Sequence, residues 1–246
     1  IFCYFDRNIF YFDVVKSEFV KFVTIEKDDN VQDIAFLYNG DLLIGTYRNL
    51  FLYSDLGILK KTQEWWTYAP VLLPSQEKNG LNYVIQFVPN NHDAAYEIWE
   101  FTGDLSFVGN KKAIDSRGSF IRKNNRIFSN TAYTDDGGTT WNKLPLSTDE
   151  YLTYFNLGHD GNFYYEIDND VFMSADSGHT FTKMDFSFEN VNGWKEDISY
   201  VSASKDGVFV LEAYGDDCIP DIYTSNQNQN LKKVNTEIGP YHVDNV

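Results

Sequence analysis

Short apolar runs separated by polar turn residues recur along the chain. Residues 39–46 read as a turn followed by a strand, and residues 49–55 add a short loop, a second strand and another turn. The same order returns twice, at 160–165 with 170–176 and at 206–211 with 222–226. Gly, Asp and Asn in the turns, with aromatic and β-branched residues in the runs, are typical of short β-strands. The pattern predicts an all-β protein built from a repeated strand unit.

Two segments align without gaps and are the clearest sign of repetition. Residues 134–141 read TDDGGTTW and residues 174–181 read SADSGHTF, so their starts lie 40 residues apart. Both fit the pattern (Ser/Thr)-x-Asp-x-Gly-x-Thr-(Trp/Phe). Repeated at this spacing, the pattern resembles the Asp-box of the sialidase-like, BNR-repeat propellers. The resemblance implies a β-propeller. The motif itself occurs in these two segments, whereas the spacing of the predicted strands resembles the family over the whole chain.

Each residue type of such a box has a structural task in a tight turn. Aspartate caps N–H groups of the turn, glycine permits a positive φ, and the terminal aromatic side chain fills the apolar layer between neighbouring sheets. We therefore interpret six box residues as structural rather than catalytic: Asp136, Gly138, Trp141, Asp176, Gly178 and Phe181.

The places where a predicted strand runs into a turn set the number of blades. They fall near Asp13, Ser54, Thr102, Thr134, Ser174 and Thr224. This spacing predicts one propeller domain over residues 1–246 with six four-stranded blades, and five blades with ragged ends are the alternative. The first blade lacks its inner strand, because residues 1–5 read as a second strand. We expect residues 241–246 to supply that strand and close the ring, which would hide two sheet edges.

Charge and hydropathy narrow the choice of partners. The chain has 36 Asp and Glu against 20 Lys and Arg, a formal net charge of −16, which would repel a phosphate backbone or an anionic membrane. No run approaches the roughly 18 apolar residues of a membrane helix. We therefore expect neither nucleic-acid binding nor membrane insertion. The propeller resemblance implies a periplasmic, cell-surface or secreted protein.

The sequence contains no recognised motif for binding zinc or a nucleotide cofactor. Cys3 and Cys218 lie far apart without a CxxC pair, and the four histidines are scattered, so zinc and thioredoxin-like chemistry have no local support. No glycine motif for phosphate or dinucleotide binding occurs. We expect no cofactor and assign no metal, while an Asp-lined calcium site stays open. Whether Cys3 and Cys218 are free thiols or a disulfide joining the first and last blades is also open.

Candidate ligand-binding residues follow from the resemblance. In propellers of this family the ligand site lies on the face opposite the Asp-box turns, in loops between blades and between second and third strands. Trp194 stands in a stretch that reads as a loop, and stacking on a sugar is one use of such an aromatic side chain. From their positions in the predicted order of strands, nine residues are candidates: Arg7, Tyr47, Arg48, Asp168, Asp170, Trp194, Tyr214, Asp216 and Asp217.

The catalytic set of a sialidase is not evident. Such an enzyme would need three converging arginines, whereas Arg117, Arg122 and Arg126 crowd into one predicted blade and no Arg-Ile-Pro motif occurs. We therefore predict a non-catalytic binding or scaffold propeller that recognises a glycan or a protein. The alternative is a glycoside hydrolase or lyase, which would need two carboxylates at a suitable separation. No pair of acidic residues can be singled out for that role.

Overall fold

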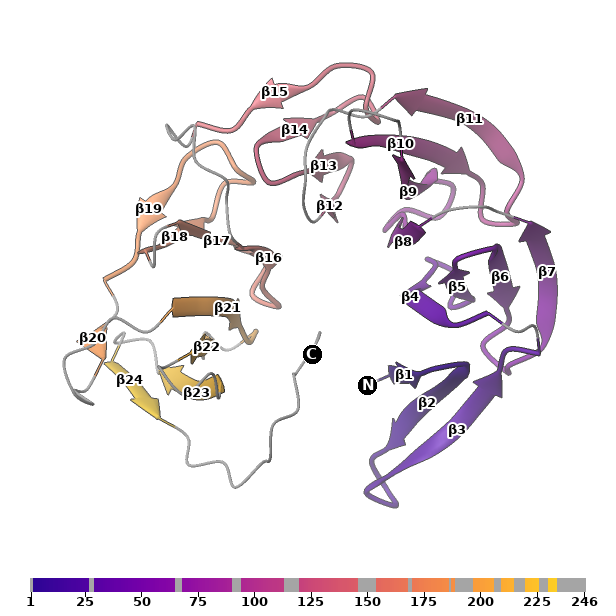
Figure 1. The fold of residues 1–246 in the computed structure, drawn as a ribbon, viewed down its shortest axis with the longest axis horizontal. Coiled ribbons are helices and arrows are strands. Elements are labelled where there is room, and N and C mark those ends of the chain that lie inside the picture. Colours follow the sequence, from indigo (N-terminus) through magenta and orange to yellow (C-terminus); the bar gives the residue numbers. More distant parts are fainter. Residues whose placement is uncertain are drawn as a thin grey trace. The chain divides into compact units, whose positions relative to one another are not determined.

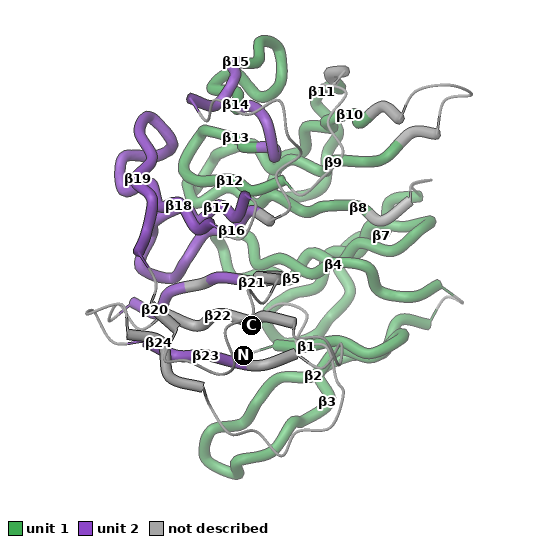
Figure 2. The backbone as a smooth tube through the Cα atoms, turned by 60° about the vertical axis from the view of Figure 1, so that its left-hand side comes forward, with its two compact units in different colours: residues 1–128, 133–141 green, residues 129–132, 142–246 purple. Residues whose placement is uncertain are grey.

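A computed structural model shows strands and connecting turns throughout the residues that it describes. These are residues 2–26, 29–64, 68–89, 94–112, 120–145, 154–167, 170–185, 187–188, 197–205, 209–214, 220–225 and 230–233. Their strands form six sheets, which confirms the all-β prediction. Within the same ranges, no helix is long and apolar enough to cross a membrane. The chain divides into two compact units, unit 1 with residues 1–128 and 133–141 and unit 2 with residues 129–132 and 142–246 (Figure 2).

Unit 1 contains three complete antiparallel sheets, in which each strand pairs with the next along the chain (Figure 1). The first sheet consists of β1 (Phe2–Phe5), β2 (Asn8–Asp13) and β3 (Glu18–Thr24). The second consists of β4 (Val31–Phe36), β5 (Leu42–Thr46), β6 (Asn49–Tyr53) and β7 (Leu59–Glu64). The third consists of β8 (Tyr68–Leu73), β9 (Asn82–Pro89), β10 (Ala94–Phe101) and β11 (Phe107–Lys112).

The division between the units falls at the fourth sheet, and unit 2 contains the last two. The fourth sheet consists of β12 (Ile121–Lys123), β13 (Arg126–Phe128), β14 (Ala132–Thr134) and β15 (Asn142–Lys143). The fifth consists of β16 (Tyr154–Leu157), β17 (Phe163–Ile167), β18 (Asp170–Ser174) and β19 (Thr182–Lys183). The sixth consists of β21 (Asp197–Ala203), β22 (Phe209–Tyr214), β23 (Pro220–Ser225), β24 (Asn230–Lys233) and β20 (Ser187–Phe188).

The sixth sheet has one strand more than the four that the repeat predicts. β20 pairs with β24 in the parallel direction, through Ser187 with Asn230 and Phe188 with Leu231. It therefore covers the outer edge of β24, which would otherwise present unpaired N–H and C=O groups.

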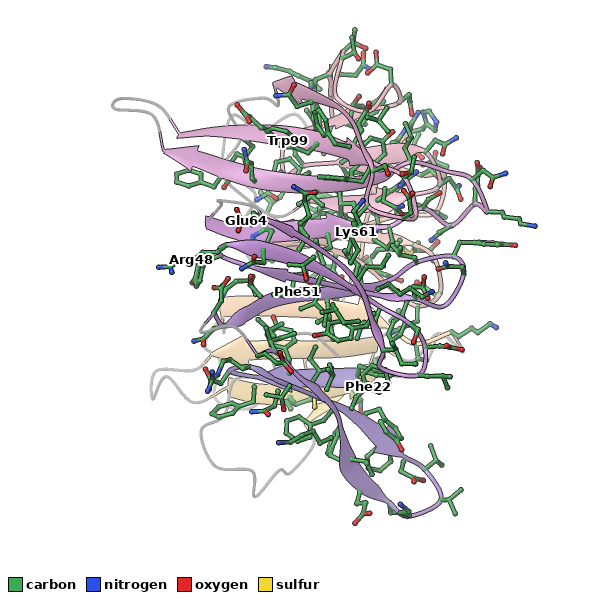
Figure 3. All side chains as sticks on the ribbon, turned by 90° about the vertical axis from the view of Figure 1, so that its right-hand side faces the viewer. Phe22, Arg48, Phe51, Lys61, Glu64 and Trp99 are labelled. Carbon is green, nitrogen blue, oxygen red and sulfur yellow. The ribbon has the colours of Figure 1, made fainter. Side chains whose placement is uncertain are left out.

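The core of unit 1 lies between its sheets. β5 and β6 are buried along their whole length, and alternate side chains face different neighbours. Ile44 and Phe51 pack with Ile9 of the first sheet, whereas Leu43 packs with Val84 of the third sheet. Figure 3 shows Phe51 among the stacked sheets. Burial on both faces explains why residues 42–44 form a continuous apolar run instead of alternating with polar residues.

The observed strand ends agree with the predicted ones to within one residue. The third strand of each blade unit ends at Asp13, Tyr53, Phe101, Thr134, Ser174 and Ser225. The first sheet has three strands, as the missing inner strand predicts, and β1 pairs with β2 alone among the described residues. Residues 241–246, expected to close the ring, lie outside the described part of the chain.

The two box segments, residues 134–141 and 174–181, form what we call the aspartate turns. In the first, Thr134 Oγ1 accepts the Gly138 N–H (2.8 Å) and donates to Asp136 Oδ1 (2.8 Å). The Asp136 carboxylate accepts the N–H and the hydroxyl of Thr140, each at 2.8 Å. Gly138 has a φ of 96°, a conformation that only glycine adopts without strain.

The second aspartate turn repeats this hydrogen-bond pattern. Ser174 Oγ accepts the Gly178 N–H (2.8 Å) and donates to Asp176 Oδ1 (2.9 Å). Asp176 accepts the N–H and the hydroxyl of Thr180 at 2.9 and 2.6 Å, and Gly178 has a φ of 81°. Ser177 also has a positive φ, 60°, which the pattern did not predict because it leaves that position open. The bonds from Thr180 lower the pKa of the Asp176 carboxyl.

Both aromatic residues that end the aspartate turns contact buried side chains. Trp141 packs against a cluster that contains Tyr83 and Ile98 of the third sheet, so it fills the layer between the third and fourth sheets. Phe181 makes an edge-to-face contact with Tyr165 of β17, with ring centroids 4.9 Å apart.

Side chains of two first strands bond to the first strand of the following sheet. Asp33 of β4 accepts the Leu72 N–H of β8 (2.8 Å), and Asn156 of β16 donates its Nδ2 to the Val201 carbonyl of β21 (3.3 Å). The residue type matches the group that the neighbour offers, because an N–H needs an acceptor and a carbonyl needs a donor. Burial raises the pKa of the Asp33 carboxyl to about 6.

Candidate functional site

Three of the predicted ligand-binding residues lie on turns between second and third strands, at the strand ends opposite the aspartate turns. Arg7 is in the β1–β2 turn, and Tyr47 and Arg48 form the β5–β6 turn. The segment that joins β3 to β4 bonds to the first turn, because the Ile25 N–H donates to the Arg7 carbonyl (2.9 Å). The same segment carries Asp29, which bonds to the second turn. The structure therefore brings these two turns to one linker.

Asp29 fixes the backbone of the β5–β6 turn. Its side chain is only 7% exposed, and Oδ2 accepts the Thr46 hydroxyl (2.5 Å), the Arg48 N–H (2.9 Å) and the Asn49 Nδ2 (3.3 Å). Tyr47 is 41% exposed above it, and Figure 3 shows the Arg48 side chain projecting from the edge of its sheet. Asp29 was missed as a site residue because the chain around it reads only as a polar linker.

Two further predicted residues belong to unit 2, where each lies at a strand end between the second and third strands of its own sheet. Asp170 begins β18 in unit 2, and its carboxylate pairs with Lys183 Nζ at 2.5 Å. The backbone of Tyr214 ends β22, where it pairs with Asp197 and Pro220. Four candidates lie outside the described residues: Asp168, Trp194, Asp216 and Asp217.

Two arginines of the fourth sheet are engaged in structural contacts. Arg122 donates to the carbonyls of Leu81 (2.6 Å), Asn124 (2.8 Å) and Leu73 (3.3 Å), and burial lowers its pKa. Arg126 binds the Asp135 carboxylate with two N–H groups, at 2.7 and 2.9 Å. Arg117, the third arginine of this predicted blade, lies outside the described residues, so the expectation about the three arginines stays a prediction.

Metal-binding and thiol candidates were compared with the described part of the chain. Among the described residues, no group of three or more His, Cys, Asp or Glu side chains is placed to hold a metal ion. Cys3 is an exposed thiol. Cys218 lies outside the described residues, so the disulfide hypothesis stays a prediction.

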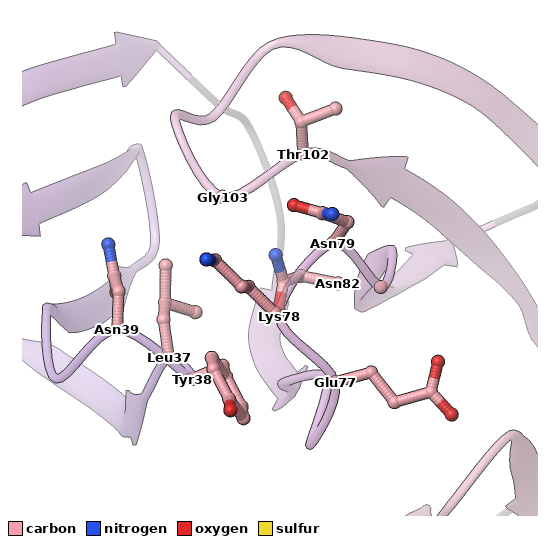
Figure 4. A pocket seen from close by; sticks show the side chains of 10 residues that line it. Leu37, Tyr38, Asn39, Glu77, Lys78, Asn79, Asn82, Thr102 and Gly103 are labelled. Carbon is pink, nitrogen blue, oxygen red and sulfur yellow. The ribbon is translucent and has the colours of Figure 1, made fainter.

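A pocket of about 270 Å³ lies at the other strand ends of unit 1, where first strands turn into second strands. Three segments line it: residues 37–39 of the β4–β5 turn, 77–80 of the β8–β9 loop and 102–103 of the β10–β11 turn, together with Asn82 (Figure 4). Sequence reasoning missed this pocket because no single segment carries it. The one available signal is the polar run at 75–80, which is longer than a tight hairpin turn requires.

Internal bonds hold the β8–β9 loop in one conformation. The Ser75 N–H donates to Asn82 Oδ1 (2.8 Å) across the base of the loop, and the Gly80 N–H donates to the Glu77 carbonyl (3.1 Å). Gly80 packs so closely that a Cβ there would lie 1.8 Å from Ser75 Oγ. Arg122 also donates to the carbonyls of Leu73 and Leu81, which lie on either side of the loop. The backbone of this part of the pocket wall is therefore held by several hydrogen bonds.

Comparison with known proteins shows the fold. A structure of streptogramin B lyase matches with a TM-score of 0.61 at 15% identity, covering 96% of this chain and 78% of that chain. The β-propeller domain of the Trilobed protease from Pyrococcus furiosus matches with a TM-score of 0.60 at 9% identity, covering 96% and 76%. YCF48 bound to D1 peptide matches with a TM-score of 0.54 at 12% identity, covering 85% and 68%.

No family model and no curated protein matches the sequence. At identities of 9–15% the structural similarity establishes the fold alone. Together with the antiparallel sheets, it shows that the chain is an all-β protein of the β-propeller class.

Proposed function

We propose that this chain is a non-catalytic binding or scaffold propeller, which recognises a glycan or protein ligand through loops at the strand ends opposite the aspartate turns. One observation carries the proposal: buried Asp29 fixes the β5–β6 turn while Tyr47 and Arg48 stand exposed on it. A fixed turn loses little conformational entropy when a ligand binds. Tyrosine and arginine are also enriched among the residues that dominate binding energies at interfaces.

The chemistry of Asp29 favours binding over catalysis. A general acid or base must reach the proton that it transfers, but the Asp29 side chain is buried and its Oδ2 accepts three bonds from the turn that it supports. Asp29 is therefore a positioning residue. The peptide-bound propeller among the structural neighbours supports the general use of such a fold in binding.

We further propose that the chain belongs to the Asp-box, BNR-repeat propellers and that residues 1–246 form one domain. The shared bonds of the two aspartate turns support the first part, and similarity to single propellers over 96% of the chain supports the second. The third sheet adds a partial box, because Thr102 Oγ1 donates to Asp104 Oδ1 (2.5 Å) and the Ser106 N–H bonds to both side chains. By analogy with this family, the proposed location is periplasmic, cell-surface or secreted.

A glycan array and a pull-down with purified candidate proteins test the binding function. Arg48→Ala and Tyr47→Ala should each reduce the affinity for a ligand that wild type binds, by on the order of tenfold. Phe19→Ala is the control, because Phe19 is an exposed aromatic residue of β3 that lies outside the β5–β6 turn and outside the pocket lining. A ligand that binds the Tyr47 and Arg48 variants as tightly as wild type would contradict the proposal. Turnover of chromogenic glycosides would instead support the hydrolase alternative.

A further inference from the structure

Two hydrogen-bond donors of the pocket described above (residues 37–39, 77–80, 82, 102 and 103) have no partner among the described residues, Lys78 Nζ and Asn82 Nδ2. Asn82 is only 4% exposed, and its Oδ1 already accepts the Ser75 N–H. Its Nδ2 has no partner among the described residues and lies at the pocket wall. Figure 4 shows the ends of Lys78, Asn79 and Asn82 directed toward the same space, while Glu77 turns away. The unused groups at the centre of the pocket therefore include two amides and one ammonium.

Two side-chain acceptors of the turns around the pocket, those of Thr102 and Asn39, are already occupied. Thr102 Oγ1 donates to Asp104 Oδ1 and accepts the Ser106 N–H (3.2 Å). Asn39 Oδ1 accepts the Asp41 N–H (3.1 Å), and its Nδ2 donates to Asp41 Oδ2 (2.8 Å). A ligand would therefore have to bring acceptor oxygens of its own to Lys78 and Asn82.

The charges near the pocket also favour a ligand with acceptor oxygens, despite the net charge of −16 for the whole chain. The Asp41 carboxylate is paired with Lys60 Nζ at 2.5 and 2.7 Å. Lys61 Nζ donates to the Asp104 carbonyl at 3.0 Å and so lies close to that acid. Lys78 has no ion pair among the described residues. The acids nearest the β4–β5 and β10–β11 turns thus have basic neighbours. Glu77 also lines the pocket, but its carboxylate is directed away from Lys78 (Figure 4), so the Lys78 ammonium can attract an anion.

The shape of the pocket selects a compact ligand. Its volume of about 270 Å³ lies just below the roughly 300–1,000 Å³ of pockets for drug-sized molecules. Buried Leu37 and the ring of Tyr38, which is 59% exposed, supply apolar surface on one side. The rest of the wall is turns, and β9 is already paired on both sides. An extended peptide therefore finds no strand edge to join, whereas a single ring can enter.

We propose that this pocket is a second binding site that takes a sugar unit bearing a carboxylate, such as a uronic acid. Lys78 and Asn82 bind the carboxylate, Asn79 bonds to ring hydroxyls, and Tyr38 packs against the C–H face of the ring. The site is separate from the β5–β6 turn, so either site can fail its test without deciding the other.

Calorimetric titration with D-glucuronate, D-glucose and a short peptide rich in Asp and Glu tests this proposal. Wild type should bind glucuronate at least about tenfold more tightly than glucose, because charge-assisted hydrogen bonds are roughly twice as strong as neutral ones. Lys78→Gln should reduce glucuronate affinity to the level of glucose. Tyr38→Ala should weaken both sugars, since both present a C–H face. In NMR spectra, glucuronate should shift the Asn82 side-chain amide.

Lys21→Gln is the matched control, because Lys21 is an exposed lysine of β3 that lies outside the pocket and the substitution removes the same charge. It should leave glucuronate affinity unchanged. Equal melting temperatures of the variants will show that each one folds. The proposal is overturned if wild type shows no saturable glucuronate binding, if Lys78→Gln and Lys21→Gln behave alike, or if the acidic peptide binds and glucuronate does not.

Discussion

Three glycines in turns differ in what an added Cβ would meet. At Gly103 a Cβ meets nothing within 4 Å and φ is ordinary; at Gly40 the space is also open but φ is 84°. At Gly138 φ is 96° and a Cβ would lie 2.7 Å from Ile98 Cδ1. The three positions therefore separate backbone strain from steric overlap.

Alanine substitutions at these glycines should form a graded series. Gly103→Ala should be close to neutral or stabilise by about 0.4–1 kcal/mol, because it restricts only the unfolded chain. Gly40→Ala should cost about 1 kcal/mol through strain, and Gly138→Ala should cost about 1–3 kcal/mol more through overpacking against Ile98. Urea unfolding measures all three. Equal stabilities of the Gly40 and Gly138 variants would show that the first aspartate turn does not pack on β10 as described.

Two kinds of carboxyl group give opposite pH dependence. The pKa of Asp136 falls to about 2 because the Thr140 N–H and hydroxyl bond to the ionised form, so its stabilising contribution is present above the unfolded pKa and is lost as pH falls from about 4 toward 2. Burial raises the pKa of Asp33 to about 6. Its contribution is therefore present below about pH 4 and is lost as pH rises through 6.

Stability curves of single variants separate these two effects. Relative to wild type, Asp33→Asn should remove a decline in stability between pH 4 and pH 6 that is on the order of 2–3 kcal/mol. Asp136→Asn should remove a decline that wild type shows below about pH 4. Denaturant unfolding at pH 3, 5 and 7 measures both. If the Asp33 variant keeps the wild-type slope between pH 4 and pH 6, the carboxyl is not held in a buried site.

At the scale of elements, the β5–β6 turn depends on the linker that joins β3 to β4. Removing the Asp29 carboxylate leaves the Arg48 N–H and the Asn49 Nδ2 without this acceptor. Asp29→Ala should therefore cost about 1–3 kcal/mol and accelerate hydrogen exchange at the Arg48 amide. Asp55→Ala serves as the control, because Asp55 is an exposed residue of the β6–β7 turn. If exchange at Arg48 is as slow in Asp29→Ala as in wild type, Asp29 does not position the turn.

For the whole molecule, a prediction about ring closure follows from β1, which among the described strands pairs with β2 alone. If residues 241–246 pair with it, deleting them exposes a sheet edge that can recruit another chain. The melting temperature should fall by at least about 2–4 °C, the shift that 1 kcal/mol produces in a chain of this size, and aggregation should increase. Hydrogen exchange checks the pairing independently, because amides of β1 that point away from β2 should then be protected. Fast exchange at those amides, with an unchanged melting temperature after deletion, would favour an open ring.

Local patterns were sufficient to predict the strand repeat. The two box segments specify their turns through neighbours within four residues, such as Thr134 with Gly138 and Asp136 with Thr140, and the apolar runs end where these turns begin. For the same reason the β5–β6 turn, formed by Tyr47 and Arg48, could be predicted. Such interactions are short in sequence, so the order of residues alone determines the class of fold, the strand ends and the turn geometry.

Contacts between residues far apart in the sequence were decided only by the tertiary structure. Asp29 meets Arg48 from 19 residues away, Arg122 reaches Leu73 from 49 residues away, and the pocket combines turns from two sheets. The parallel pairing of β20 with β24 is of the same kind. No local pattern encodes these pairs, because a polar residue in a turn looks the same whether it faces water or a neighbouring sheet. Which turns are buttressed, and where three of them enclose a pocket, depends on how the sheets pack.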